Sequence, residues 1–274
     1  MNVFHFQLLG CTIRVECAEA GAHEWARGSF GFAEVPAGTP DLSYRIHLES
    51  GVDGWGLERD GEAVATAGSA AGILGWLDQD LTVQLQRQRR DLYFLHSATL
   101  AKRSQALALV AESGGGKSTT AWALTQLGLS YMSDELAPIE PETLMVHPHP
   151  RGVQLKGQPP VPYSLPPGAL VDHGRVCIPV EELEVETLRR PMPLSWVFFL
   201  HRDPDRRQPR LERCRPAEAA TRLYSNALNV LAHPDEGLEI AMRMGGETAC
   251  FNLYAGDLAS TCDLVVGALE ATDG

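Results

Sequence analysis

The sequence contains no apolar run of the roughly 18 residues that a membrane-spanning helix needs. Its first residues, MNVFHFQLLGCTIRVE, also lack the basic start and the small-residue cleavage site of a secretory signal peptide. These two absences predict a cytoplasmic protein that has no membrane partner.

Cysteine is sparse and scattered along the chain. No C-x-x-C pair occurs, so neither a disulfide framework nor a zinc site is indicated. The simplest expectation is that the thiols are small buried hydrophobes. The six cysteines are Cys11, Cys17, Cys177, Cys214, Cys250 and Cys262.

Basic residues are few. The 23 lysines and arginines are outnumbered by 35 aspartates and glutamates, and the formal net charge is −12. The resulting field repels the phosphate backbone of nucleic acids, so nucleic acid is not expected as a partner.

The chain of 274 residues is long enough for two modest domains. Residues 1–90 contain short strand-forming runs separated by turn residues such as Asp60-Gly61. This pattern predicts a small β-rich domain. Ser69 is a candidate N-cap for a helix that has apolar residues at three- and four-residue spacing and connects to the second domain. The expected strands are Val3–Leu9, Thr12–Cys17, Leu42–Leu48, Gly54–Arg59 and Ala63–Thr66.

Residues 91–274 change to strands that alternate with helices, the pattern of an α/β domain. The expected strands are Tyr93–Thr99, Ala106–Ala111, Leu129–Ser133, Leu144–His147, Val153–Lys156, Trp196–His201 and Thr248–Leu253. The expected helices are Lys117–Leu127, Pro216–Leu231, Glu236–Met244 and a closing helix from about Gly256. The segment from Gln158 to Gly174 is dense in proline and glycine, which predicts a loop or lid; an irregular connection that covers a sheet edge is the alternative.

The segment AESGGGKSTT, residues 111–120, is a glycine-rich loop between an apolar strand and a helix. Glycines lack a Cβ, so several backbone N–H groups can converge on a phosphate beside the positive end of the helix dipole. Lys117 would reach the β- and γ-phosphates, and the Ser118 hydroxyl would bind a Mg²⁺ ion that bridges them. The residues expected to bind ATP are Ser113, Gly114, Gly115, Gly116, Lys117, Ser118 and Thr119.

The loop departs from the usual signature at one position, because Ala111 stands where glycine is normal. A flexible Gly/Ser linker is the alternative interpretation. An apolar strand directly before the loop and the helix-forming AWALTQL directly after it do not fit a linker. We therefore expect a phosphate-binding loop.

Asp134 and Glu135 follow the strand that comes after the loop helix. In a doubly wound sheet the carboxyl ends of the strands share one crevice, so a carboxylate here is expected to face the phosphates. One acid can accept the proton of an attacking hydroxyl while the other supports the metal, and the spacing leaves open which does which. The alternative is that Asp134 only starts a turn before Ala137-Pro138.

His96 lies on the expected strand before the loop strand, where a histidine is by itself more often a core residue than a catalytic one. The whole order, a strand with His96, then AESGGGKSTT, a short helix and YMSDE, resembles the HPr kinase/phosphorylase superfamily and especially its shorter relatives. The resemblance spans Leu92–Lys156 and implies a P-loop kinase domain of the HPr kinase type. It also implies that Asp134 is the base that activates a serine hydroxyl and that His96 orients or tunes this base. Glu135 is the second acid of the motif and is expected with Ser118 at the Mg²⁺.

The segment from Pro148 to Lys156 resembles a proline/basic motif of the same relatives. The resemblance implies that Lys156, and less directly Arg151, stabilises charge on the transferring phosphoryl group. Two solvent-facing charges are the alternative. No glycine-rich segment like the family's bifunctional signature follows the acidic pair, so efficient reversal by inorganic phosphate is not expected.

The sequence therefore predicts an ATP-dependent kinase that phosphorylates a hydroxyl, expected to be that of a serine, on a protein, peptide or small-molecule acceptor. A P-loop ATPase or GTPase, with a metal-binding Asp134 and a water-activating Glu135, is one alternative, and a nucleotide-binding regulator without turnover is another. No LSGGQ-like segment and no N-K-x-D motif are present, and Lys117, Ser118 and both acids disfavour the non-catalytic binder. The identity of the acceptor, ATP against GTP, and homo-oligomer formation stay open.

Overall fold

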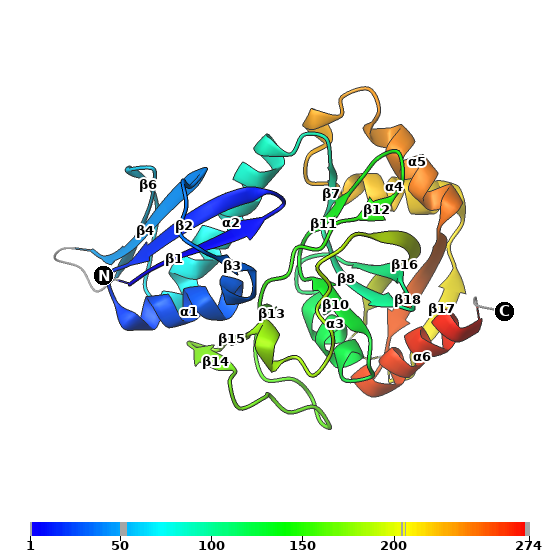
Figure 1. Ribbon diagram of the computed structural model, residues 1–274. Coiled ribbons are helices and arrows are strands. Elements are labelled where there is room, and N and C mark those ends of the chain that lie inside the picture. Colours follow the sequence, from blue (N-terminus) through cyan, green and yellow to red (C-terminus); the bar gives the residue numbers. More distant parts are fainter. Residues whose placement is uncertain (1, 50–53, 204, 206, 272–274) are drawn as a thin grey trace. The chain divides into compact units, whose positions relative to one another are not determined.

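The computed structural model describes residues 2–49, 54–203, 205 and 207–271, and these form a mixed α/β fold with three sheets. The chain divides into two compact units, and Figure 1 labels their elements. The first unit comprises Met1–Arg89, Pro150–Pro159 and Leu165–Leu183, and the second Arg90–His149, Pro160–Ser164 and Glu184–Gly274. The chain thus passes to the second unit where the sequence places its boundary, but two later segments return to the first. Within the described residues, no helix combines the length and the apolar character needed to cross a bilayer.

The first unit is built on a six-stranded sheet with the strand order β3-β1-β2-β4-β5-β6. Its strands are β1 Asn2–Leu8, β2 Cys11–Cys17, β3 Glu34–Val35, β4 Leu42–Leu48, β5 Trp55–Arg59 and β6 Glu62–Ala67. Its helices are α1 Ala20–Phe30 and α2 Ala70–Gln88, with 3₁₀ turns η1 Gly31–Ala33 and η2 Val180–Glu182. All five strands expected in this region are therefore present.

Period-two alternation buries one face of this sheet. In β2 every second residue is buried, and Ile13 and Val15 join Phe6, Trp25 and Leu81 in one apolar core. Both helices of the first unit contribute to this core. The alternation in the sequence thus fixes which face of the sheet the helices cover.

The connecting helix α2 begins where its capping signal predicts. The Ser69 side chain accepts a hydrogen bond of 3.1 Å from the backbone N–H of Gly72. The buried residues of α2 include Ile73, Leu77 and Leu81, which recur at helical spacing. The predicted helix is confirmed.

Helix α1 was not among the expected elements. It contains Gly21 and Gly28, which lower helix propensity, and its N-cap Glu19 makes no side-chain capping bond. The helix is stabilised instead by burial of Trp25 and Phe30, whose ring stacks on Phe6 with a centroid distance of 4.7 Å. Tertiary packing therefore overrides a weak local signal.

A small sheet with the order β13-β15-β14 completes the first unit. Its strands are β13 Val153–Leu155, β14 Leu170–Asp172 and β15 Arg175–Ile178. Two expectations need correction here: β13 does not belong to the unit of the phosphate loop, and the end of the proline-rich segment is a paired strand rather than a loop. Asp172 also accepts a hydrogen bond of 3.0 Å from the Ala71 N–H, which ties β14 to the start of α2.

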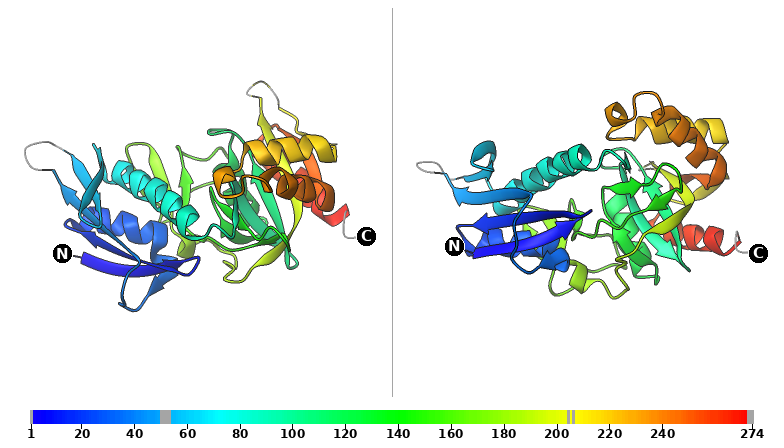
Figure 2. Two further views of the ribbon diagram at one scale, coloured as in Figure 1. Left: turned by 90° about the horizontal axis from the view of Figure 1, so that it is seen from above. Right: turned by 45° about the horizontal axis from the view of Figure 1, so that its top comes forward.

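In its described residues, the second unit contains a nine-stranded sheet and four helices. Its strands are β7 Tyr93–Leu95, β8 Ser97–Lys102, β9 Gln105–Val110, β10 Ser130–Ser133, β11 Ala137–Ile139, β12 Met145–Val146, β16 Met192–Arg202, β17 Arg210–Arg213 and β18 Ala249–Ala255. Its helices are α3 Lys117–Thr125, α4 Pro216–Ser225, α5 Gly237–Glu247 and α6 Leu258–Ala271, with η3 Val230–Ala232. Helices α4 and α5 lie side by side on one face of the central strands, and α3 and α6 lie on the other (Figures 1 and 2).

The sheet of the second unit is mixed rather than doubly wound. Strands β9, β16 and β18 are parallel, but β8 is antiparallel to β9 and β10 is antiparallel to β8. Two successive reversals make β10 run in the same direction as β9. The carboxyl ends of β9 and β10 therefore lie at the same end of the sheet, as expected. The reason differs from the expected one, because β10 and β9 are separated by the antiparallel strand β8 and do not pair in parallel.

Two predicted elements are divided in the structure. The expected strand 93–99 breaks at His96 into β7, which pairs with β11, and β8, which pairs with β9. The expected helix 216–231 ends at Ser225, and the chain then forms a bridge between Ala227 and Leu95 before the 3₁₀ turn η3. The two breaks lie beside each other, because Ala227 bridges to Leu95 and the Asn226 carbonyl accepts a hydrogen bond from the His96 N–H.

Candidate phosphate and acid site

The loop between β9 and α3 has the backbone that converging N–H groups require. Gly114 and Gly116 have φ angles of +82° and +96°, a region that residues with a Cβ rarely adopt. The N–H of Gly115 bonds to the Glu112 carbonyl at 2.9 Å, and α3 begins directly after Gly116. The loop is therefore a tight turn at the N-terminus of a helix, an arrangement that suits an anion.

The alanine at the usual glycine position has a local consequence. A Cβ added to Gly115 would lie 2.9 Å from the Ala111 Cβ and 3.0 Å from the Glu112 carbonyl oxygen. A side chain at residue 115 and the Ala111 methyl group therefore exclude each other. The departure at Ala111 is accommodated because residue 115 is glycine.

The directions of three neighbouring strands bring four candidate residues together at one end of the sheet. The amino end of β8 lies beside the carboxyl end of β9, because Ser97 pairs with Val110. The carboxyl end of β10 lies on the other side of β8, because Ser133 pairs with Thr99. His96, Lys117, Asp134 and Glu135 therefore meet where these three strands begin or end.

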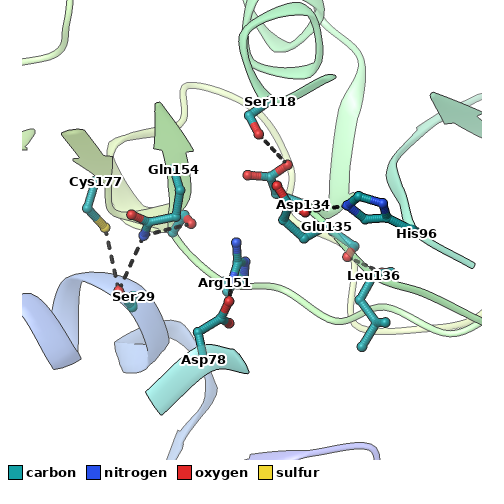
Figure 3. A network of polar contacts seen from close by, with 12 residues as sticks. Ser29, Asp78, His96, Ser118, Asp134, Glu135, Leu136, Arg151, Gln154 and Cys177 are labelled. Atoms are coloured by element: carbon teal, nitrogen blue, oxygen red, sulfur yellow. Dashed lines mark hydrogen bonds and ion pairs between the residues drawn. The ribbon is translucent and has the colours of Figure 1, made fainter. Parts of the chain in front are cut away.

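The first contact across this edge joins the loop helix to the acidic pair. The Ser118 hydroxyl donates a hydrogen bond of 2.9 Å to Oδ1 of Asp134, as Figure 3 shows. Asp134 is completely buried. A hydroxyl and a carboxylate in this position are the oxygen donors that Mg²⁺ prefers beside a polyphosphate.

The second contact involves the other acid. Nε2 of His96 lies 2.7 Å from Oε2 of Glu135 and 3.1 Å from Nζ of Lys117 (Figure 3 draws the pair with Glu135). Lys117 is buried and also donates a hydrogen bond of 3.1 Å to the Ala111 carbonyl. A histidine ring nitrogen is either a hydrogen-bond donor or an acceptor. His96 Nε2 can therefore donate to Glu135 or accept from Lys117, but it cannot do both at once.

Glu135 differs from Asp134 in exposure and in backbone. Its side chain is 41% exposed, and its φ of +76° lies in the left-handed region. Strained backbone of this kind persists only where surrounding contacts hold it. The Ser133 hydroxyl supplies one such contact by donating to the Leu136 carbonyl, which closes the turn around both acids. Sequence reasoning missed this role, although a serine before a turn is the signal for it.

Helix α3 is anchored by groups far along the chain. The Trp122 ring packs edge-on against Tyr163, with a centroid distance of 5.7 Å, and the Cys262 thiol lies 4.0 Å from the Thr120 carbonyl. Burial raises the pKa of the Cys262 thiol to about 12, and burial also raises the pKa of Tyr163 to about 12. Both groups are therefore neutral at physiological pH and act as packing groups beneath the loop helix.

A polar network lies at the end of the next parallel strand. β16 pairs with β9 up to Phe199 and Val110, so its last residues extend beyond the base of the loop. Nε2 of His201 lies 3.0 Å from the Asn252 oxygen, and the Asn252 amide nitrogen donates to Glu218 at 3.1 Å. The Asn252 hydrogen bond, assisted by Arg222, holds the pKa of Glu218 below its usual value. Sequence reasoning did not identify this network.

The two basic residues expected at the phosphoryl group belong to the first unit. Arg151 is buried and forms an ion pair with Asp78 of α2, as Figure 3 shows, so its charge has a partner within that unit. Lys156 follows β13 and is exposed. Sequence reasoning missed Asp78, which no local motif connects to Arg151. The remaining loop residues, Ser113 and Thr119, lie in the turn before α3 and in its first turn.

Among the residues that the structure describes, no group of three or more His, Cys, Asp or Glu side chains is arranged to hold a metal ion. No protein-family model matches the chain, and no curated protein matches it.

Proposed function

We propose that this protein is an ATP-dependent phosphotransferase with a P-loop domain of the HPr kinase type. It would transfer the γ-phosphoryl group to a hydroxyl of a protein, peptide or small acceptor. The observation that carries the proposal is the convergence of the glycine loop with Ser118, Asp134, Glu135 and His96 at one sheet edge. A turn formed by the two acids does not require a contact between Glu135 and His96, which are 39 positions apart in the sequence.

The nucleotide side of the site uses the loop and α3. The loop backbone would bind the phosphates, and Lys117 would compensate their charge. Ser118 and Asp134 fit a Mg²⁺ ion, because both present oxygen atoms and already lie 2.9 Å apart. When bound, this ion neutralises charge on the β- and γ-phosphates.

The acceptor side requires a base, and the contacts support Glu135 more than Asp134. Asp134 is buried and bonded to Ser118, whereas Glu135 is partly exposed and bonded to His96. The acceptor oxygen would attack the γ-phosphorus as its proton passes to the carboxylate, and the bond to the bridging oxygen of ADP would break. The sequence-based assignment of Asp134 as the base stays a prediction.

A second candidate is a P-loop hydrolase, and one observation favours it. The hydrogen bond between Ser118 and Asp134 supports Asp134 as the acid on the metal side, which would leave Glu135 to activate a water molecule. The same residues would then act without any acceptor. Kinase and hydrolase therefore differ in the nucleophile and not in the nucleotide site.

The deciding experiment offers the purified protein ATP labelled at the γ-phosphate with serine-containing peptides and small hydroxyl compounds. Mass spectrometry detects the gain of one phosphate, and release of inorganic phosphate is followed in parallel without acceptor. Phosphate transfer to an acceptor that is lost in the Lys117→Ala variant supports the kinase proposal. Rapid phosphate release in the absence of every acceptor, without transfer in its presence, supports the hydrolase.

A further inference from the structure

Exposed apolar side chains are concentrated in one segment of the second unit, from the end of α4 to the middle of α5. Of the twelve large apolar side chains that are exposed in the described chain, five occur within residues 224–242. Leu231 is 90% exposed and Met242 58%. A cluster of this kind marks an interaction site more often than single exposed residues do. We call these five residues the α4–α5 corner: Tyr224, Leu228, Leu231, Leu238 and Met242.

Local geometry brings members of the corner together. Leu238 and Met242 are four residues apart on α5 and therefore lie on one face of that helix. A Cβ on Gly237 would lie 3.5 Å from the Tyr224 ring, so this ring rests against the first turn of α5 beside Leu238. Figure 2 shows α4 and α5 next to each other in both views.

The acidic and basic side chains within the segment that carries the corner all have one sign. Residues 224–242 contain three acids, Asp235, Glu236 and Glu239, all exposed, and no lysine or arginine. The nearest cations in the sequence, Arg222 and Arg243, form ion pairs with Glu218 and Glu247 on their own helices. A complementary partner therefore combines apolar side chains with positive charge.

The segment that carries the corner is also hydrogen-bonded to the backbone around His96. The Asn226 carbonyl accepts a hydrogen bond of 2.9 Å from the N–H of His96, and the Leu228 N–H donates to the Phe94 carbonyl at 2.8 Å. The Asn229 side chain bonds to the Phe94 N–H at 2.9 Å. The segment that carries the corner thus acts as an extra strand beside β7 and holds the backbone of His96.

We propose that the α4–α5 corner docks a polypeptide that presents apolar side chains together with lysine or arginine, and that this polypeptide carries the acceptor hydroxyl. The second part of the proposal rests on the phosphotransferase function proposed above. An extended surface with both apolar and charged contacts suits a peptide segment better than a small molecule. The corner therefore narrows the acceptor class to a basic, partly apolar polypeptide.

Three synthetic peptides of equal length, each with one serine and a fluorescent label, test the docking surface. Apart from that serine, the first combines leucine and lysine, the second leucine and glutamate, and the third glycine and lysine. Binding is measured by fluorescence anisotropy at physiological salt without nucleotide. We expect the leucine–lysine peptide to bind more tightly than the other two, since only it matches both the apolar surface and its acids.

The triple variant Leu231→Ser, Leu238→Ser, Met242→Ser should weaken binding of the leucine–lysine peptide about tenfold. Replacing the three acids by Asp235→Asn, Glu236→Gln and Glu239→Gln should also weaken it and reduce its salt dependence. The control is Leu127→Ser, which removes an apolar side chain that is 44% exposed elsewhere in the same unit. Unchanged binding in the triple variant, or an equal loss in the control, overturns the docking surface.

Two further measurements separate this proposal from the kinase proposal. If the leucine–lysine peptide binds at the corner but the protein binds no Mg-ATP, the phosphotransferase proposal fails and the docking surface stands. If Mg-ATP binds and serine peptides are phosphorylated equally by wild type and triple variant, the corner does not dock the acceptor. Sedimentation measures the oligomeric state of the wild type and of the triple variant. If the wild type is a dimer and the triple variant is a monomer, the corner is a contact between two copies of the chain, and the proposal is overturned.

Discussion

Ser118 and Asp134 are joined by a hydrogen bond of 2.9 Å between the serine hydroxyl and the carboxylate Oδ1. The bond connects the first turn of α3 with the residue that follows β10, so it fixes the loop helix relative to the acidic pair. Glu135, the adjacent residue, bonds to His96 instead. Two neighbouring acids thus contact two different groups, and three of the predictions below test what the residues of this region do.

Lys117→Ala should lower the affinity for Mg-ATP by about 10- to 100-fold, the effect expected from losing a hydrogen-bonded charge. Isothermal titration calorimetry measures the affinity, and circular dichroism shows whether the buried position still folds. Lys117→Met, which keeps most of the side-chain volume, is the matched control for packing. Wild-type affinity in both variants would contradict the phosphate-loop assignment.

Asp134→Asn and Glu135→Gln should separate the two acids, because each change removes a charge with little change of shape. Loss of the base should lower single-turnover transfer by about 10²- to 10⁴-fold while nucleotide binding survives. Loss of the metal-side acid should mainly raise the Mg²⁺ concentration needed for half-maximal activity. The contacts assign the first result to Glu135→Gln. If Asp134→Asn gives it instead, the sequence-based assignment is right.

His96→Phe keeps a ring of similar size but removes the nitrogen that faces Glu135 and Lys117. Transfer should fall by roughly 10- to 100-fold, because Glu135 loses the partner that orients it. His96→Gln retains a polar side chain and should recover part of the rate. Single-turnover kinetics at saturating Mg-ATP measure both variants, and equal rates in all three proteins would exclude a positioning role for His96.

Arg151→Met should act on stability rather than on transfer. The guanidinium is buried and paired with Asp78, whose side chain is 25% exposed, so breaking the pair should cost about 1–3 kcal/mol. Urea unfolding followed by fluorescence measures the free energy, and Asp78→Asn should cost a similar amount. A loss of transfer at unchanged stability would instead favour the role at the phosphoryl group that the sequence suggests.

The cysteines should be unreactive in the folded protein, because all six are buried. Burial raises the pKa of Cys17 and of Cys262 to about 12, whereas an unfolded thiol ionises near about 8.5. Between these values the unfolded chain holds fewer protons than the folded one, so stability should fall as the pH rises above about 9. Iodoacetamide labelling at mildly alkaline pH, counted by mass spectrometry before and after unfolding, tests the first point, and urea midpoints across this pH range test the second.

The sequence by itself determined the features that local chemistry controls. Alternation in Cys11–Cys17 fixes which residues of that strand are buried, and Ser69 caps α2 through a bond to Gly72. The positions of Gly114 and Gly116 are equally local, since their positive φ angles depend on the absence of a Cβ. Such patterns involve residues only a few positions apart, so they are readable without the fold.

The tertiary structure alone decided which distant groups meet. Asp134 and Glu135 lie in the bend after β10 and reach different partners, Ser118 and His96, and the strand order β10-β8-β9 brings these partners to the bend. The pairing of Arg151 with Asp78 and the burial that stabilises α1 are decided in the same way, because the groups in contact come from separate parts of the chain. Local propensity carries no information about these encounters, which depend on the packing of whole elements.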